Sequence, residues 1–340
     1  MALTTTIEEV KAMLPNFISN LSDTDSLPNF LAAEYKYLVP VTGVGLYNDI
    51  HTKYNTTPGA MTPDETNLLL KMRLMVVAHA YHDGLILGHI TLTDNGARKF
   101  NPNDTVPVAK WEYEKLERTL LNTAYDAMEV LLLFLFEKKA SFALWTASAE
   151  YISFNSLLIK TGTDFSEHFA LYQPMRTFFS VRKIVRNAQD MFLVQGVGVD
   201  LLAYIIGKVD PDTELTKIIL KLKSALAFYT IKLCCEHYNV RFSHEGFTVL
   251  SGETNDSADH GGRKSAEPTD LDMKMQAAQK MADHYMAQAQ YSLVAYYNRD
   301  ESPVAEDAFK TAFDAGPLKS YVDPADRTSG NETHKGVFRL

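Results

Sequence analysis

The feature that most constrains the fold is that the chain repeats itself at a spacing of about 150 residues. Four short landmarks occur twice in the same order: LLLKMR at 68–73 and IILKLK at 218–223, ITLTDNG at 90–96 and VRFSHEG at 240–246, TGVG at 42–45 and QGVG at 195–198, and Pro-Asp at 63–64 and 211–212. The first two pairs have a spacing of 150, the third of 153 and the fourth of 148. Such a chain is expected to build one structural unit twice.

Each copy predicts a long helix, a β-hairpin and a second long helix. Thr62-Pro63-Asp64-Glu65 combines an N-cap, a first-turn proline and a glutamate three residues after the cap, which together begin a helix. Each hairpin is expected at a turn containing glycine. The expected elements are helices at about 63–87 and 107–139 around a turn at Asp94-Asn95-Gly96, and helices at about 211–238 and 270–298 around a turn at His244-Glu245-Gly246.

The predicted fold class is therefore mainly α with two short β-hairpins, formed by tandem duplication of a helix–β-hairpin–helix unit. The expected organisation is a first unit in residues 1–155 with its helix–hairpin–helix at about 62–139, a second unit in 156–298 with its helix–hairpin–helix at about 210–298, and an extended C-terminal arm at 299–340.

Two polar segments are expected to contact neighbouring chains. The loop at 251–269 is longer than its counterpart in the first copy, and lengthening a surface loop costs little free energy. The end of the chain is polar up to a closing Val337-Phe338-Arg339-Leu340. Segments of this composition bury little of their own surface, so a neighbour has to supply the contacts. The predicted contacting residues of the arm are Tyr321, Val337, Phe338 and Leu340.

Composition and charge favour a soluble globular protein that does not grip nucleic acid. Of the 340 residues 46% are hydrophobic, and the net charge is -9, whereas binding to phosphates demands a basic surface. The most apolar run, Val130 to Phe136, is about a third of the ~20 residues that a membrane span needs, so we expect a buried helix segment. The only cysteines, Cys234 and Cys235, are adjacent, which makes them poor disulfide partners and indicates a reducing compartment.

Metal chemistry has two weak candidates. Asp256, Asp259, His260 and Asp270 in the polar loop could ligate a metal ion, but the regular spacing of a calcium loop is missing.

His79 and His82 share a helix face beside Asp83, but no HExxH motif or third ligand accompanies them. We expect no catalytic centre, no cofactor and no metal, and we expect His79, His82 and His244 to be hydrogen-bonded or solvated.

The two glycine pairs, Gly43-Val44-Gly45 and Gly196-Val197-Gly198, resemble the start of a dinucleotide-binding loop. Neither continues to a third glycine, and neither follows a clear strand. Their presence at matching places in both copies predicts a structural bend instead. No P-loop and no G-x-S-x-G motif occurs in the sequence.

Several stretches between about 85 and 206 resemble a family of Bacteroidetes phage and prophage proteins that are encoded among virion structural genes. The resemblance is carried by ITLTDNGARK, AKWEYEKLERTLLNTAYDAMEVLLLFL, LWTASAEYISFNSLLIKTGTDFSEHF and RTFFSVRKIVRNAQDMFLVQGVGVDLLAYI. It implies a head–tail connector, or neck ring, protein without catalytic residues. The expected partners are further copies of the chain in a ring, the portal protein, and tail and neck proteins of the same phage.

The resemblance places the protein at the head–tail interface of a virion, after assembly in the cytoplasm of the bacterial host. DNA would pass through the lumen of the ring without tight binding, because the chain is acidic. One alternative is another virion assembly protein, such as a tail hub or an internal component. A second, from a different class, is a metal-dependent enzyme that uses the 251–270 loop.

Overall fold

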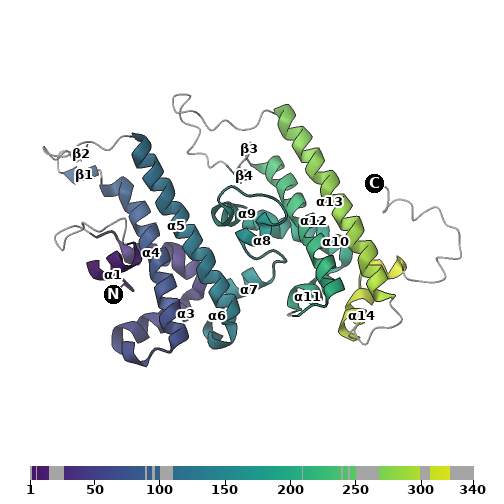
Figure 1. The fold of residues 1–340 in the computed structure, drawn as a ribbon, viewed down its shortest axis with the longest axis horizontal. Coiled ribbons are helices and arrows are strands. Elements are labelled where there is room, and N and C mark those ends of the chain that lie inside the picture. The colour runs from purple at the N-terminus through teal and green to yellow at the C-terminus, as the bar shows by residue number, and fades with distance from the viewer. Residues whose placement is uncertain are drawn as a thin grey trace. The chain divides into compact units, whose positions relative to one another are not determined.

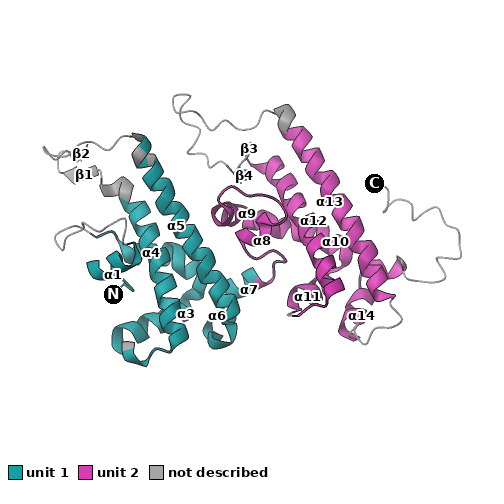
Figure 2. Ribbon diagram, in the orientation of Figure 1, with its two compact units in different colours: residues 1–154 teal, residues 155–340 magenta. Residues whose placement is uncertain are grey.

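In a computed structural model, the chain divides into two compact units, residues 1–154 and 155–340 (Figure 2). The division lies one residue from the boundary expected from the repeat. The structure describes residues 2–4, 6–14, 27–88, 90–93, 96–99, 110–208, 210–238, 240–243, 246–249, 268–298 and 307–321.

Unit 1 contains two long antiparallel helices, α4 and α5, joined through a β-hairpin (Figure 1). Its elements in chain order are α1 (Ile7–Met13), α2 (Phe30–Ala33), the π-helical turn η1 (Glu34–Leu38), α3 (Val39–Thr56), η2 (Pro58–Ala60), α4 (Pro63–Gly88), β1 (Ile90–Thr93), β2 (Gly96–Lys99), α5 (Lys110–Glu137), η3 (Lys139–Ser141), α6 (Ala143–Thr146) and α7 (Ala149–Asn155).

Unit 2 has a similar order, and short helical elements follow its closing helix as they do in unit 1. Its elements are α8 (Gly162–Ser166), α9 (Pro174–Ala188), the π-helical turn η4 (Gln189–Leu193), α10 (Val194–Val197), α11 (Val199–Gly207), α12 (Thr213–His237), β3 (Val240–Ser243), β4 (Gly246–Val249), α13 (Pro268–Tyr297), α14 (Asp307–Asp314) and η6 (Pro317–Tyr321).

The two hairpins have the same register, which confirms the predicted fold class and the spacing of 150. In the first, Ile90 pairs with Lys99 and Thr93 with Gly96. In the second, the equivalent residues pair in the same way, from Val240 with Val249 to Ser243 with Gly246. A register shift of one residue would reverse the faces of a strand, so identical registers indicate the same hairpin twice.

The buried stripes of the two closing helices also match, at a spacing of 158. Apolar side chains every three or four residues place one face of each helix in the core. The matching buried pairs are Leu120 and Ala278, Ala124 and Ala282, Met128 and Met286, Leu131 and Ala289, and Leu135 and Leu293. The increase from 150 to 158 falls between hairpin and helix, where the second copy has its longer polar loop.

The repeat extends further towards the N-terminus than the sequence landmarks indicated. Thr6 caps α1 by accepting a hydrogen bond from the Glu9 amide at 3.3 Å. Thr161 holds the equivalent place in unit 2, at a spacing of 155, and caps α8 by accepting a hydrogen bond from the Asp164 amide at 3.1 Å. Each cap fixes the first turn of its helix, so the two units begin in the same way.

The acidic residue in each capped helix forms a matching ion pair with the first long helix of its unit. Glu9 Oε1 lies 2.7 Å from Arg73 Nη2, and Asp164 Oδ1 lies 2.7 Å from Lys223 Nζ. The two acids follow the spacing of the caps, whereas the two bases follow the spacing of the hairpins. The change of spacing is therefore confined to the connection between α3 and α4 and its counterpart before α12.

A buried polar side chain opens the π-helical turn of each unit. The Glu34 carboxylate accepts hydrogen bonds from the Leu3 amide at 2.6 Å and the Tyr47 hydroxyl at 2.7 Å. Gln189, its counterpart at the spacing of the caps, accepts a hydrogen bond from the Leu158 amide at 2.9 Å. A buried backbone N–H without a partner is costly, so each side chain fixes the extended segment that precedes its unit's first helix.

Glycine makes the predicted bend in both units, which confirms its structural role. Gly43 has φ 74° and ψ 153°, and Gly198 has φ 93° and ψ 151°. The helical segments on either side of Gly198 meet at 111°. The predicted alignment of TGVG with QGVG is wrong by two residues, because it pairs Gly45 with Gly198. The backbone pairs Gly43 with Gly198, at the same spacing as the caps.

The C-terminal segment differs from the extended arm predicted at 299–340. Residues 307–321 form α14 and η6, and Phe309, Phe313 and Leu318 are buried within unit 2. The rings of Phe309 and Tyr204 on α11 meet edge to face, 5.6 Å apart. The spacing of the two phenylalanines gives α14 an apolar face, which the polar composition of the segment concealed. Residues 322–340 lie outside the described part of the chain.

The bend predicts that alanine has different effects at a glycine with positive φ and at a glycine inside a helix. Gly198→Ala should lower the free energy of unfolding by ~2 kcal/mol, because positive φ disfavours a side chain. Its Cβ would also lie 3.0 Å from Gly316 Cα and from Pro317 Cδ. Gly45→Ala is the control, since its Cβ would meet nothing closer than Leu144 at 4.0 Å. It should leave the protein equally stable or raise stability by up to ~1 kcal/mol. Urea unfolding measures both, and equal effects would contradict the assignment of the bend.

Candidate functional site

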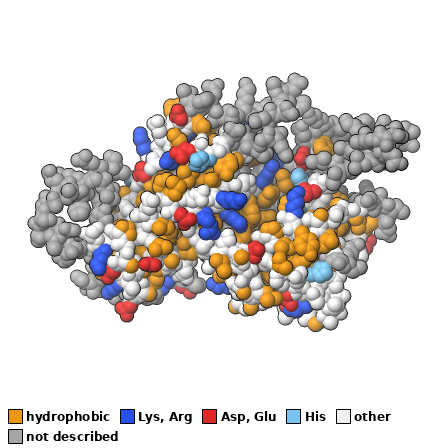
Figure 3. All heavy atoms as spheres, turned by 180° about the vertical axis from the view of Figure 1, so that it is seen from behind, with side chains coloured by type: hydrophobic (Ala, Val, Ile, Leu, Met, Phe, Trp, Pro, Cys, Tyr) orange, Lys and Arg blue, Asp and Glu red, His pale blue; other side chains and the backbone are white. Residues whose placement is uncertain are grey.

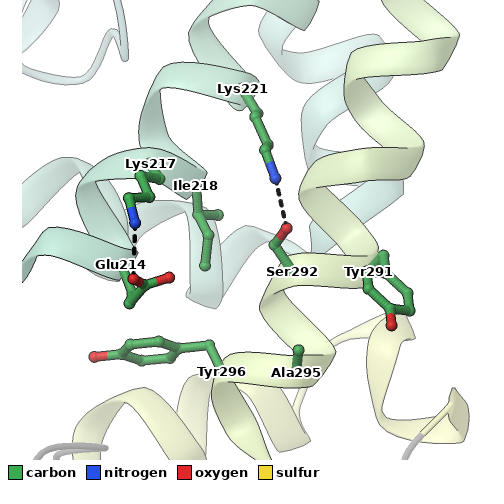
Figure 4. A pocket seen from close by; sticks show the side chains of 8 residues that line it. All are labelled: Glu214, Lys217, Ile218, Lys221, Tyr291, Ser292, Ala295 and Tyr296. Atoms are coloured by element: carbon green, nitrogen blue, oxygen red, sulfur yellow. Dashed lines mark hydrogen bonds and ion pairs between the residues drawn. The ribbon is translucent and has the colours of Figure 1, made fainter.

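A hollow of about 140 Å³ opens on unit 2 between the first turns of α12 and the last turns of α13 (Figure 4). Ile218 and Tyr296 are largely buried and supply its apolar part. The lining residues are Glu214, Lys217, Ile218, Lys221, Tyr291, Ser292, Ala295 and Tyr296.

Two lysines place positive charge at the hollow. Lys217 Nζ lies 2.9 Å from Glu214 Oε1, and Lys221 Nζ donates to Ser292 Oγ at 2.8 Å (Figure 4). The Lys217 and Glu214 side chains are 59% and 42% exposed, so this ion pair is open to solvent. The hollow therefore combines an apolar surface with cations that can meet an anion or the face of an aromatic ring.

The equivalent place in unit 1 is filled by an aromatic ring. Lys71, the counterpart of Lys221 at the spacing of the hairpins, has its Nζ 5.2 Å from the centre of the Phe134 ring. Phe134, the counterpart of Ser292 at the spacing of the closing helices, is only 7% exposed. The same lysine thus faces a phenylalanine in one unit and a serine in the other, and the hollow lies where the serine replaces the ring.

Apolar side chains are exposed at matching positions of the two units. Leu70 is 46% exposed and Leu220, its counterpart at the 150 spacing, 45%. Val44 and Val199, which each follow a bend glycine, are 55% and 62% exposed. Figure 3 shows hydrophobic side chains gathered in patches between charged ones on one face of the molecule.

His79 is buried, which contradicts the prediction that it is hydrogen-bonded or solvated. Neither ring nitrogen has a hydrogen-bond partner among the described residues. The ring stacks on Tyr37, with ring centres 3.8 Å apart, and meets the edge of Tyr125. Burial lowers the pKa of His79 to about 3. A neutral ring in an aromatic stack has a packing role. The sequence could not show this, because His82 and Asp83 beside it along the helix indicate a polar surrounding instead.

Unit 2 repeats the stack with different residues. Phe192 and Tyr229 are the counterparts of Tyr37 and His79, and their ring centres are 4.1 Å apart. The Tyr229 hydroxyl donates to Asp283 at 2.8 Å. Asp283 corresponds to Tyr125 at the 158 spacing, so the third partner recurs as well.

His82 and Asp83 belong to a polar cluster at the surface of unit 1. Asp83 accepts hydrogen bonds from Lys36 at 2.8 Å and from Tyr37 at 2.9 Å. Burial alone would raise the pKa of Asp83, but these contacts outweigh it and lower the pKa. His82 Nδ1 lies 3.2 Å from Asp83 and its Nε2 3.9 Å from Glu117. His244 lies outside the described residues.

Among the residues that the structure describes, one group of potential metal ligands was missed by the sequence reasoning. Asp164, Glu167 and His168 place ligand atoms within 4.8 Å of one another. Asp164, however, is bound by Lys223 through both oxygens, at 2.7 and 2.9 Å. His168 Nδ1 lies 2.9 Å from Ser224 Oγ. Because unit 1 has the matching pair Glu9–Arg73, the Asp164 carboxylate has a structural role in the repeat.

Of the predicted loop ligands, Asp256, Asp259 and His260 lie outside the described residues. Asp270 lies in the first turn of α13, and its side chain is not among those described.

Tyr321 ends η6, and of the predicted arm residues it alone falls in the described part of the chain, without its side chain. Val337, Phe338 and Leu340 lie beyond it.

The two cysteines are free and buried, as expected of poor disulfide partners. Burial raises the pKa of Cys235 to about 11 and that of Cys234 further. Both thiols are therefore protonated at neutral pH and unreactive as nucleophiles.

Among the described residues, α5 contains one stretch, Lys115–Glu137, that is long and apolar enough to cross a membrane. Half of that stretch is buried in the fold, and core helices of soluble proteins share these properties.

His79 predicts a loss of stability on acidification. The unfolded chain protonates histidine near pH 6.5, whereas the folded chain holds His79 neutral down to about pH 3. The unfolded state binds more protons between these values, so stability falls as the pH drops through that window, by up to ~1.4 kcal/mol per pH unit.

His79→Phe keeps a ring in the stack, so it should flatten the fall in unfolding free energy between pH 7 and pH 5. Tyr229→Phe is the matched control. It removes the hydrogen bond to Asp283 and should lower stability by ~1 kcal/mol at both pH values without changing the slope. Urea unfolding across this range measures both effects. An unchanged slope in His79→Phe would show that His79 is not the titrating group.

No curated protein and no solved structure matches the chain. A family model does match, over residues 38–155 and 199–297, which together make up more than half of the sequence. Each matched range contains one helix–hairpin–helix. The chain belongs to this family, which is described as a family of unknown function (DUF6712).

Proposed function

We propose that the protein is a structural subunit of a bacteriophage head–tail connector, a neck protein that forms a ring between portal and tail. The observation that carries the proposal is the repeated exposure of apolar side chains at Leu70 and Leu220 and at Val44 and Val199. A single exposed leucine is ordinary on a protein surface. The two copies have diverged elsewhere, yet both keep these positions apolar and exposed. This favours a surface that is used twice.

A chain with two similar units is suited to ring assembly. Rings form when one surface of a subunit contacts a different surface of the next and the rotation between them closes. A duplicated unit offers each of its surfaces twice per chain, so fewer chains complete a ring with a given number of units. The resemblance of residues 85–206 to phage virion proteins supports the same role.

The charge of the chain suits a conduit for DNA. A net charge of -9 disfavours adhesion of phosphates to a lumen wall, so the duplex would slide through. The proposed partners are copies of the chain, the portal protein, and neck and tail proteins at the head–tail interface of the virion.

A native mass spectrum of the purified protein tests the proposal. We expect one closed oligomer with a fixed number of chains. Leu70→Glu and Leu220→Glu should each weaken association at least about tenfold, since removing a buried leucine from a contact costs ~1.5–3 kcal/mol.

Two substitutions at exposed polar positions are matched controls, Thr119→Glu on α5 and Gln276→Glu on α13. They add the same charge without removing an apolar contact. A strictly monomeric protein, or equal effects of controls and leucine variants, would count against ring assembly through these surfaces.

A further inference from the structure

The two units differ at one place in a way that indicates a missing side chain. In unit 1, Lys71 lies over the ring of Phe134, and the ring fills the space between α4 and α5. In unit 2, Lys221 instead reaches Ser292, and the hollow remains beside it (Figure 4). The backbone path is the same in both units, so what unit 2 lacks at this point is an aromatic ring.

The hollow is of the right size for such a ring. Its volume is about 140 Å³, and a protein cavity of about 150 Å³ is known to hold a benzene molecule. Its apolar lining comes from Ile218, Ala295 and Tyr296, and Lys221 stands at the edge, as Lys71 does over Phe134. A phenylalanine would bury its ring there and gain a cation–π contact.

The chain itself carries a segment of matching chemistry. Val337-Phe338-Arg339-Leu340 offers one aromatic ring, two aliphatic side chains and a guanidinium. Lys221 would lie over the ring of Phe338 as Lys71 lies over Phe134. The segment therefore supplies the ring that unit 2 lacks.

The connecting chain is long enough. Residue 321 ends η6, which contacts α13, and 16 residues separate Tyr321 from Phe338. An extended chain covers about 3.3 Å per residue, so this linker reaches roughly 50 Å.

We propose that Phe338 inserts into the hollow between α12 and α13 of its own chain, in the position that Phe134 occupies in unit 1, with its ring against Lys221. The segment comes from the same chain, because its linker is long enough to reach the hollow without a second copy.

Disulfide trapping in the full-length chain tests the proposal. Ala295→Cys places a thiol in the wall of the hollow, and Val337→Cys places one beside Phe338 without removing the ring. A disulfide requires the two Cβ atoms to come within about 4.5 Å, so it reports close approach. The native Cys234 and Cys235 are buried and do not compete. Ser141→Cys with Val337→Cys is the matched control, because Ser141 is an exposed serine of η3, just beyond the end of α5 in unit 1.

We expect at least about tenfold more cross-linked product from the Ala295 pair than from the Ser141 pair. Mass spectrometry and non-reducing gels then tell whether the link joins one chain or two. A link within one chain supports the insertion, and a link found only between chains overturns it.

Two further changes test the aromatic ring itself. Phe338→Ala should reduce the link to the level of the control, because the inserted ring is gone. Ser292→Phe should do the same by filling the hollow as Phe134 fills unit 1, without lowering the unfolding temperature.

A link at control level, or one that persists after Phe338→Ala, would overturn the inference. Because the native mass spectrum measures assembly separately, a ring without the link would refute only the insertion, and a link without a ring would refute only the connector.

Discussion

The architecture depends on a sharp change of direction that only glycine makes without strain. At Gly43 and Gly198 the backbone leaves one helical segment and enters the next with positive φ and extended ψ. Ser148 and Glu150 crowd the first site, and Gly316 and Pro317 crowd the second. A side chain at either place would meet both backbone strain and its neighbours, so these two residues set the direction of the helical segments that follow them.

Around each bend, polar contacts connect segments that are far apart in sequence. Glu34 and Gln189 hold the extended segments at Leu3 and Leu158, and Glu9 and Asp164 pair with Arg73 and Lys223. The ion pairs keep their charges in both units, whereas the carboxylate of Glu34 is replaced by the neutral amide of Gln189, and burial raises the pKa of Glu34. The geometry of each contact is preserved, so the repeat is clearer in the contacts than in the residue identities.

The long elements could be predicted from the sequence because their signals are local. The helix cap at Thr62, apolar stripes and turn glycines placed four long helices and two hairpins. The hollow could not be predicted, since it arises from a serine at 292 facing a lysine 71 residues away. The burial of His79 was missed for the same reason, because it depends on which distant residues cover the ring. The helix at 307–314 was missed because the polar composition of its segment concealed the local apolar spacing of Phe309 and Phe313. The two-residue error at the bend came from choosing between two glycines by sequence, where only backbone dihedral angles distinguish them.

Divergence at the facing positions of the helix pairs has a consequence for folding fidelity. Tandem copies of one path risk pairing a helix of one copy with a partner from the other, a common failure of repeat proteins. If α12 packed on α5, Tyr229 would face Tyr125 and lose the carboxylate of Asp283. If α4 packed on α13, Lys71 would meet Ser292 and lose the ring of Phe134. Each exchanged pairing forfeits a contact that the native pairing makes, so the differences between the copies direct every long helix to its own partner.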